Sequence, residues 1–523
     1  MQKRKNIRPC VLVILDGYGV APSGPGNAIE LSNPVCMHRL MRDFPSTTLS
    51  ASGEAVGLPY GEVGNTEVGH LSLGAGRVIL QSLPRINTSI VDSSFYKNKA
   101  FLGAIAHIKK THGKLHLIGL IGEHHVHAST DHLFALLYFC REHSIENSFL
   151  HIITDGRDSP PKAALKLLPQ VDELVKSLNV GTISTIMGRY YAMDRDQHWE
   201  RISKAYECLT EGSGVKANNW YEAINSSYNE GKSDEFIQPT SIIRDGKPIG
   251  LVEDGDAVIF FNYRIDRPRE LTETFVIENF PSHDTFNRGQ KLKDLYFVTM
   301  TDYQRNLPVH IAFTQHPIHD TLGSVLEKNN IQQLRIAESE KERFVTIYFN
   351  GLHDKSFKGE DNVIIPSPRV ATYDLKPEMS ALSITKSVNE AIIEGNYGFI
   401  VVNFANADMV GHTGIKKATI EAIKVLDDCI DSITKQALKN KWTVYITGDH
   451  GNAEEKINPI TKQISTEHTN NPVPFIVVDS LLYKIKKSIQ VGTLCDVAPT
   501  ILAHMGIEKP KSMIGKDLLQ KLH

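Results

Sequence analysis

Short apolar runs that end at once in polar residues recur along the chain and predict buried strands. The segments 11–15, 399–403 and 443–447 are rich in β-branched and aromatic residues, and acidic turns follow each of them. Between the last two segments, apolar residues return at close to helical spacing over 418–435. This order predicts a β-α-β unit. It favours a doubly wound, mostly parallel sheet whose ligands lie beyond the carboxyl ends of its strands.

The acidic turns at Asp16, Asp408 and Asp449 belong to distant parts of the chain, so one sheet that contains them must be discontinuous. We expect one domain from residues 1–81 and 316–523, with a second domain inserted at 82–315. The insert has strand signals of its own, which predict that it is also α/β. These signals lie at 115–120, 149–153, 182–187, 257–261 and 295–300.

The amino-acid composition limits the kinds of partner that the protein is expected to bind. With 57 basic and 60 acidic side chains among 523 residues, the net charge is −3, which offers no general attraction to nucleic acid or anionic membranes. No apolar run reaches the roughly 18 residues of a spanning helix, and the first residues do not resemble a signal peptide. The six cysteines are scattered without a C-x-x-C pair, which predicts buried free thiols. We expect a cytoplasmic protein.

Carboxylates and imidazoles gather on the predicted strand-end loops. Such donors suit borderline divalent ions such as Mn²⁺ or Zn²⁺. Each residue alone has an ordinary alternative role as a helix cap, turn former or hydrogen-bonded structural histidine. Three histidines on strand-end loops of one sheet instead favour a dimetal site. The candidate ligands are Asp16, Asp408, His412, Asp449, His450 and His468.

A glycine-bounded turn at 64–70 carries one hydroxyl, that of Thr66. A hydroxyl at a sharp bend suits a nucleophile that attacks phosphate. The alternative is that Thr66 caps a helix, with Glu67 in its first turn. A neighbouring metal ion would favour the nucleophile, because coordination acidifies a hydroxyl.

Arginines follow several predicted strands of the insert, where their guanidinium groups could bind carboxylate or phosphate. The alternative is ion pairing with neighbouring aspartates. Together they predict a small anionic substrate. The residues are Arg157 and Asp158, Arg189 and Arg195, and Arg264 and Arg267. The histidines of 123–127 could form another metal site, although their spacing does not establish one.

These motifs resemble those of the cofactor-independent (2,3-bisphosphoglycerate-independent) phosphoglycerate mutases, a family in the alkaline phosphatase superfamily. The matching segments are 12–19, 154–161, 188–195, 403–414, 447–454 and 494–500. The resemblance implies an alkaline-phosphatase-like catalytic domain with an inserted substrate-binding transferase domain. It implies an isomerase of glycolysis and gluconeogenesis that interconverts 3-phosphoglycerate and 2-phosphoglycerate through a phosphoenzyme intermediate.

The resemblance also implies a role for each site residue. One Mn²⁺ would be held by Asp408, His412 and His468, and the other by Asp16, Asp449, His450 and the Thr66 hydroxyl; Zn²⁺ or Co²⁺ are alternatives. Glycerate would be bound by His127, Arg157, Asp158, Arg189 and Arg195, and phosphate by Arg264, Arg267 and Lys341. Asp158 is also the candidate for proton transfer. No 2,3-bisphosphoglycerate is required, and a monomer is expected.

Two positions depart from the family pattern. The family nucleophile is serine in G-N-S-E-V-G-H, whereas this chain has Thr66, and the family motif G-G-V-H-S-H appears at 124–129 as H-H-V-H-A-S. Threonine keeps the hydroxyl but adds a methyl group that restricts χ1. We expect activity, because the hydroxyl and His127 are both retained.

Two other functions fit parts of the pattern. The same metals and nucleophile could serve a phosphatase or a mutase for another phosphorylated metabolite, against which the arginine motifs argue. A non-enzymatic metal-binding protein is the third hypothesis, in which Thr66 would mark the loss of catalysis. Retention of every other candidate ligand argues against it.

Overall fold

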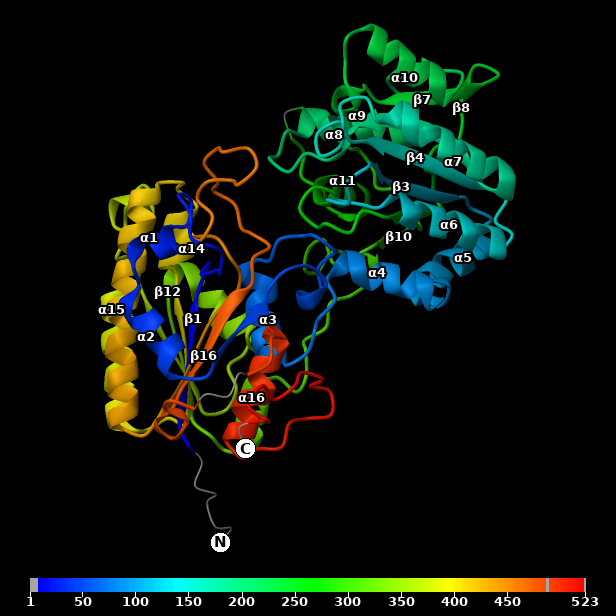
Figure 1. The fold of residues 1–523 in the computed structure, drawn as a ribbon. Coiled ribbons are helices and arrows are strands. Elements are labelled where there is room, and N and C mark those ends of the chain that lie inside the picture. Colours follow the sequence, from blue (N-terminus) through cyan, green and yellow to red (C-terminus); the bar gives the residue numbers. More distant parts are fainter. Residues whose placement is uncertain (1–7, 284, 486–488, 522–523) are drawn as a thin grey trace. The chain divides into compact units, whose positions relative to one another are not determined.

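The computed structural model describes residues 8–283, 285–485 and 489–521 (Figure 1). The chain divides into two compact units, one formed by Met1–Gln81 with His316–His523 and the other by Ser82–Gln315. Within the described residues, no helix combines the length and the apolar composition needed to cross a membrane.

A mixed sheet of eight strands forms the centre of the first unit. In spatial order its strands are β13 (Glu360–Ile365), β12 (Gln333–Glu338), β14 (Phe399–Phe404), β1 (Cys10–Leu15), β15 (Thr443–Gly448), β16 (Val473–Val478), β2 (Ser46–Ser50) and β17 (Gly492–Thr493). Strand β1 lies between β14 and β15 and is parallel to both, so that Leu15 is level with Phe404 and Gly448. The three strands predicted from the apolar runs are therefore adjacent, and their carboxyl ends coincide.

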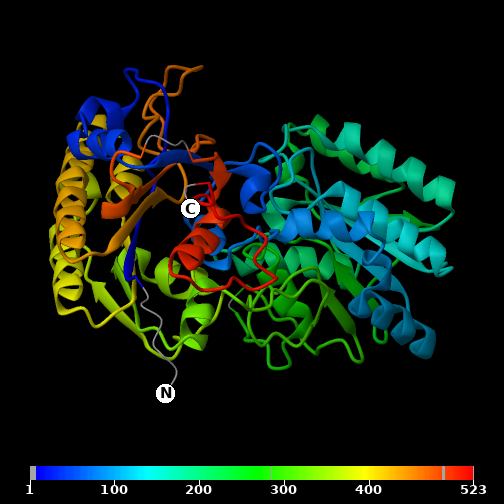
Figure 2. The same ribbon diagram turned by 60° about the horizontal axis from the view of Figure 1, so that its bottom comes forward.

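Helices cover both faces of this sheet (Figures 1 and 2). On one face lie α1 (Ala28–Ser32), α2 (Val35–Asp43), α13 (Ala381–Glu394) and α15 (Lys416–Lys439); on the other lie α3 (Thr66–Ala75), α12 (Leu322–Lys328) and α16 (Val497–His504). Alternate residues of β1 enter the two cores: Val11 and Val13 pack on one side, Leu12 and Ile14 on the other. Burial on both faces explains why the strand is apolar throughout.

The second unit contains another parallel-rich sheet. Its strands in spatial order are β11 (His310–Ile311), β10 (Tyr296–Thr299), β9 (Ala257–Phe260), β3 (Leu115–Ile121), β4 (Ser148–Thr154), β5 (Thr182–Gly188), β7 (Thr240–Arg244) and β6 (Val215–Ala217), and β8 (Lys247–Pro248) pairs with β7. All five strand signals of the insert correspond to strands, and the pairing is parallel from β11 to β5. The helices are α4 (Ser82–Val91), α5 (Lys99–Thr111), α6 (Thr130–Glu142), α7 (Ala164–Leu178), α8 (Arg189–Ala192), α9 (Trp199–Thr210), α10 (Trp220–Asn229) and α11 (Arg269–Val276).

The cysteines behave as their scattered spacing predicts. All six are buried and carry free thiols. Burial raises the pKa of the Cys140 thiol to about 12, so this side chain stays protonated and unreactive near neutral pH.

Candidate dimetal active site

Three adjacent strand ends supply the centre of the site. Asp16 directly follows β1, Asp408 lies in the short helix α14 (Asn406–Gly411) after β14, and Asp449 and His450 follow β15. All four side chains are buried. Parallel pairing in register brings these positions to one edge of the sheet, although up to 434 residues separate them in the sequence.

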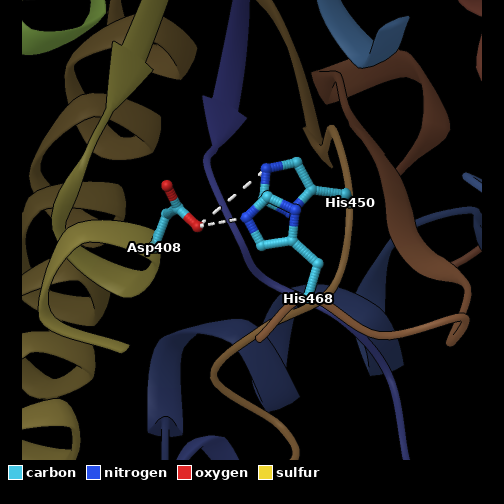
Figure 3. A group of neighbouring side chains, drawn as sticks. All are labelled: Asp408, His450 and His468. Carbon is cyan, nitrogen blue, oxygen red and sulfur yellow. Dashed lines mark ion pairs between the residues drawn. The ribbon is translucent and has the colours of Figure 1, made fainter. Parts of the chain in front are cut away.

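One group of donors surrounds the Asp408 carboxylate. Its Oδ1 lies 3.1 Å from His412 Nε2, 3.2 Å from His468 Nε2 and 4.0 Å from His450 Nε2. Figure 3 shows the stacked rings of His450 and His468 facing this carboxylate, with ring centroids 3.9 Å apart. The structure thus brings together the first predicted ligand set, and His450 adjoins it.

A second group lies on the other side of His450. Thr66 Oγ1 is 3.0 Å from His450 Nε2 and 3.3 Å from Asp16 Oδ1, while Asp449 Oδ2 is 3.6 Å from His450 Nε2. Within the described residues, His450 is therefore shared by two groups of three side chains that could hold a metal ion: Asp408, His450 and His468, and Asp16, Asp449 and His450.

Thr66 is the first residue of α3, and its side chain does not cap the helix. Asn65 is the N-cap, with Oδ1 accepting a hydrogen bond from Val68 N at 3.1 Å. The alternative in which Thr66 caps is therefore wrong, although Glu67 does lie in the first turn. Because Asn65 accepts the hydrogen bond from the first turn of α3, the Thr66 hydroxyl is not needed as a cap and contacts the Asp16 carboxylate instead.

The three imidazoles are oriented for metal binding by backbone carbonyls. Their Nδ1 atoms lie 2.7 Å from Thr466 O for His412, 2.8 Å from Gly64 O for His468 and 3.2 Å from Gly451 O for His450. An Nδ1–H that donates to a carbonyl leaves Nε2 as the ligand atom, and all three Nε2 atoms face carboxylates. The buried Asp449 Oδ2 lies 3.2 Å from His70 Nδ1 and 3.6 Å from His450 Nε2. This donor set fits divalent cations.

Lys341 is a buried cation among the carboxylates of the site. Lys341 Nζ lies 2.8 Å from both Asp16 Oδ1 and Asp408 Oδ2, and 3.1 Å from Thr66 Oγ1. Burial alone would lower the pKa of Lys341, but the carboxylates outweigh it and raise that pKa well above its usual range. For His450, too, burial opposes the charge, yet Asp449 and its neighbours raise the pKa to about 10. The same carboxylates would attract a divalent cation, which must displace the proton on His450 Nε2 to be bound there.

In the second unit, Arg189 connects two of the predicted substrate ligands. Its Nη1 donates to Asp158 Oδ2 at 2.5 Å and to Asp155 Oδ1 at 2.6 Å, and its Nη2 donates to His127 Nε2 at 2.8 Å. Burial, followed by the charge of Arg189, lowers the pKa of His127 to about 4, so the ring is neutral at pH 7. His127 Nδ1 is buried without a hydrogen-bond partner, and it carries the hydrogen because Nε2 accepts from Arg189.

Asp266 joins two of the other arginines. Its Oδ2 accepts from Arg195 Nη1 at 2.7 Å, and its Oδ1 accepts from Arg264 Nε at 3.2 Å. Burial, together with the charges of nearby arginines, lowers the pKa of Arg267. Arg157 is more exposed and lies 3.7 Å from Glu235. Arg157, Arg189, Arg195 and Arg264 thus do form the ion pairs expected as their alternative role, and Arg267 donates to Met193 O at 3.0 Å.

The histidine run at 123–127 does not converge on one point. His124 and His125 are exposed, whereas His127 is buried against Arg189. None of the groups of three potential metal donors in the part of the chain that the structure describes includes these histidines.

Comparison with known proteins gives the family. Residues 86–305 match the family model described as BPG-independent PGAM N-terminus, and residues 289–507 match the sulfatase model. The 2,3-bisphosphoglycerate-independent phosphoglycerate mutase of Moorella thermoacetica is 46% identical over 514 residues, covering 98% of this chain and 99% of that protein. This chain belongs to the same family. The phosphoglycerate mutase of Acetivibrio thermocellus is 43% identical over 512 residues, again covering 98% and 99%.

A solved phosphoglycerate mutase has the same fold. The crystal structure of the Leishmania mexicana enzyme, determined at low cobalt concentration, matches with a TM-score of 0.63 and 26% identity, covering 98% of each chain. The resemblance identified from the motifs and the predicted fold class are both confirmed. Family membership and the donor groups together support divalent metal ions as cofactors of this chain.

Two further residues contact the site, and the sequence did not single them out. Asn403, within β14, donates through Nδ2 to Asp16 Oδ2 at 2.8 Å and to His70 Nε2 at 3.0 Å. His70 Nδ1 lies 2.9 Å from Thr66 O and 3.2 Å from Asp449 Oδ2. Two sequence features could have indicated these residues. Asn403 is a polar residue inside an apolar strand, and His70 follows Thr66 by one helical turn.

Proposed function

We propose that this chain interconverts 3-phosphoglycerate and 2-phosphoglycerate through a phosphothreonine at Thr66, without 2,3-bisphosphoglycerate. One observation carries the assignment of the nucleophile. The Thr66 hydroxyl lies within hydrogen-bond distance of Lys341 and His450 and between the two donor groups, in a chain that belongs to the mutase family. The reaction belongs to glycolysis and gluconeogenesis.

In the proposed reaction, Thr66 Oγ1 attacks phosphorus and forms the phosphothreonine bond, while the bond from phosphorus to the glycerate oxygen breaks. The Thr66 hydroxyl loses its proton as this bond forms, and the glycerate oxygen that leaves phosphorus takes up one proton. The other glycerate hydroxyl then loses its proton as it attacks the phosphothreonine, and the released Thr66 oxygen takes one up, so no net proton is consumed. Two ions, Mn²⁺ with Zn²⁺ or Co²⁺ as alternatives, would acidify the Thr66 hydroxyl and neutralise phosphate charge. Lys341 Nζ, 3.1 Å from Thr66 Oγ1, adds a positive charge beside the attacking oxygen.

The metal ligands are proposed as the resemblance implies. Asp408, His412 and His468 would hold one ion. Asp16, Asp449, His450 and Thr66 would hold the other. The contact of His450 with both groups supports a pair of neighbouring ions.

The proposed glycerate site rests on His127 and its neighbours. The unpartnered Nδ1–H of His127 is a ready donor to a substrate oxygen. Arg157, Arg189 and Arg195 would bind glycerate, and Arg264 and Arg267, with Lys341, would bind phosphate. Because Arg189 contributes to lowering the pKa of Asp158 against the effect of burial, Asp158 is ionised at neutral pH and can accept a proton from a glycerate hydroxyl.

The test is a ³¹P NMR time course with 3-phosphoglycerate and Mn²⁺, without 2,3-bisphosphoglycerate, beside an EDTA-treated control. We expect metal-dependent formation of 2-phosphoglycerate without inorganic phosphate. Thr66→Ala should reduce turnover at least about 1,000-fold, since no other hydroxyl replaces the nucleophile, whereas Thr66→Ser should retain turnover. Undiminished turnover in Thr66→Ala would exclude Thr66 as the nucleophile.

The same experiment distinguishes the alternatives. Inorganic phosphate as the sole product would indicate a phosphatase, and bound metal without any change in substrate would indicate a metal-binding protein. We also propose a monomer, from the resemblance alone, with phosphoglycerate as its small-molecule partner. From the charge balance and the apolar pattern of the sequence we propose a cytoplasmic protein with no nucleic acid or membrane partner.

A further inference from the structure

Lys456 is a buried lysine near the two donor groups. No sequence motif indicated a role for it. It is only 1% exposed, and its Nζ donates to Gly411 O at 3.0 Å and to Asn452 Oδ1. Burial lowers the pKa of Lys456 to about 8, against the opposing effect of Glu454 and Asp408. Burying an ammonium group costs free energy unless it donates hydrogen bonds. The Lys456 side chain is therefore held in the position from which it donates to these two acceptors.

Asn452 transmits the effect of Lys456 to Asp408. The Asn452 side chain is fully buried, and its Nδ2 donates to Asp408 Oδ1 at 3.0 Å. A carboxamide can turn by 180° and exchange its donor for its acceptor. In the turned orientation its oxygen would face the Asp408 carboxylate and its NH₂ group would face the Lys456 ammonium. The lysine therefore favours the orientation that donates to Asp408.

Gly411 is the second point of contact. A Cβ on Gly411 would lie 2.4 Å from Asn452 Oδ1, so the absence of a side chain lets the carboxamide pack against the backbone. The Gly411 carbonyl that accepts from Lys456 belongs to the residue directly before His412. Lys456 thus contacts both the amide that holds Asp408 and the backbone that carries His412.

We propose that Lys456 is a positioning residue for the donor group of Asp408, His412 and His468. This inference rests on the proposed function, because it assumes that the group holds a divalent ion. Lys456 acts through Asn452 and Gly411 and contacts no reacting atom. The Asn452 hydrogen bond orients Asp408, whose Oδ1 meets His412 and His468 at 3.1 and 3.2 Å.

A positioning role and a purely electrostatic role of Lys456 predict opposite changes in metal affinity when its ammonium charge is removed. A buried ammonium repels a divalent cation, so replacing it with a neutral side chain would strengthen metal binding if charge alone mattered. Loss of the orienting contact would instead weaken binding. Outer-shell partners of metal ligands commonly contribute about 10- to 100-fold in affinity.

The experiment is a Mn²⁺ titration of the EDTA-stripped, full-length chain, followed by EPR and calorimetry. We expect Lys456→Met to weaken one of the two Mn²⁺ sites about 10-fold. Asn452→Ala should weaken the same site, and the loss in the double variant should be smaller than the sum of the two single losses, because both changes interrupt the contact between Lys456 and Asn452. The matched control is Lys417→Met, an exposed lysine of α15, which should leave both dissociation constants unchanged.

Each other outcome has a defined meaning. Binding by Lys456→Met that is equal to or tighter than that of the unaltered chain would overturn the positioning role, as would fully additive losses in the double variant. If circular dichroism shows that Lys456→Met does not fold, the Asn452→Ala variant provides the test. An unchanged Mn²⁺ dissociation constant in Asn452→Ala would then overturn the proposed positioning of Asp408 through Asn452. Absence of Mn²⁺ binding by the unaltered chain would instead overturn the metal centre and with it the proposed function.

Discussion

Thr66 shows how neighbouring contacts determine what one side chain can do. Its methyl group restricts χ1, yet its hydroxyl lies 3.0 Å from His450 Nε2 and 3.1 Å from Lys341 Nζ. The rotamer therefore directs the hydroxyl towards the donor groups, as attack on phosphorus requires. The binding of phosphate by Lys341 stays a prediction. In the structure Lys341 forms ion pairs with Asp16 and Asp408 and offsets their negative charge.

His132 is the residue for which we predict a pH dependence. Its ring is buried in α6, with Nε2 2.9 Å from Asn87 Oδ1, and burial lowers the pKa to about 3 from an ordinary value of 6.5. Below pH 6.5 the unfolded chain binds a proton that the folded chain does not. The free energy of unfolding should therefore fall by about 1.4 kcal/mol for each pH unit from 6.5 towards 3.

Urea unfolding of the unaltered chain and of His132→Gln, from pH 5 to 8, measures this contribution. Glutamine does not titrate and can donate to Asn87, so the stability difference between the two proteins should be constant above pH 6.5. Below that pH the unaltered chain should lose stability relative to the variant. The control is His124→Gln at an exposed position. The same difference at pH 5 and pH 8 would contradict the assignment.

At the scale of elements, the apolar pattern predicted the strands and the long helix around the site. Strands β1, β14 and β15 and helix α15 all lie where the pattern indicates, because burial on both faces makes such strands apolar throughout. The start of α3 was less accessible to prediction. Asparagine and threonine both cap helices, and the pattern alone does not choose between Asn65 and Thr66.

We predict that the packing of α3 against the end of β15 requires Gly69. A Cβ there would lie 2.6 Å from Asp449 O and 2.8 Å from Asp449 Cβ, so Gly69→Ala must displace the helix or the aspartate. We expect a loss of about 1–3 kcal/mol in the free energy of unfolding and weaker Mn²⁺ binding. Urea unfolding and Mn²⁺ titration measure these effects.

Gly24→Ala is the control for this substitution. No atom lies within 4 Å of a Cβ at Gly24, so its stability should change by less than about 0.5 kcal/mol. Alanine favours helices over glycine by about 1 kcal/mol. A Gly69→Ala protein more stable than the unaltered chain would show that helix propensity, not packing, dominates at this position.

At the scale of the whole molecule, similarity over 98% of the chain assigns the family, and the two units divide the chemistry. The unit of 1–81 and 316–523 contains the carboxylate and histidine groups, and the unit of 82–315 contains the arginines with His127. Their catalytic and substrate-binding roles stay predictions. The proposed reaction requires both units to act on one substrate.

Metal binding should stabilise the folded chain. Mn²⁺ at 100 times its dissociation constant should add about 2.7 kcal/mol per site and raise the midpoint of thermal unfolding, while EDTA should reverse the rise. Asp449→Asn should reduce the rise, because it removes charge from one donor group. The control is Asp302→Asn, at an exposed position outside the groups of potential metal donors among the described residues. A midpoint unaffected by Mn²⁺ would contradict the metal centre.

The sequence by itself determined which segments form the strands around the site, the donor types and the family, because burial periodicity and motif chemistry are local properties. Only the tertiary structure showed that His450 contacts both donor groups, that Asp266 joins Arg195 to Arg264, and that Lys456 reaches Asp408 through Asn452. These contacts join residues that are distant in the chain or whose side-chain directions depend on packing. They follow from sheet register and from the need to satisfy buried polar groups, which no local pattern encodes.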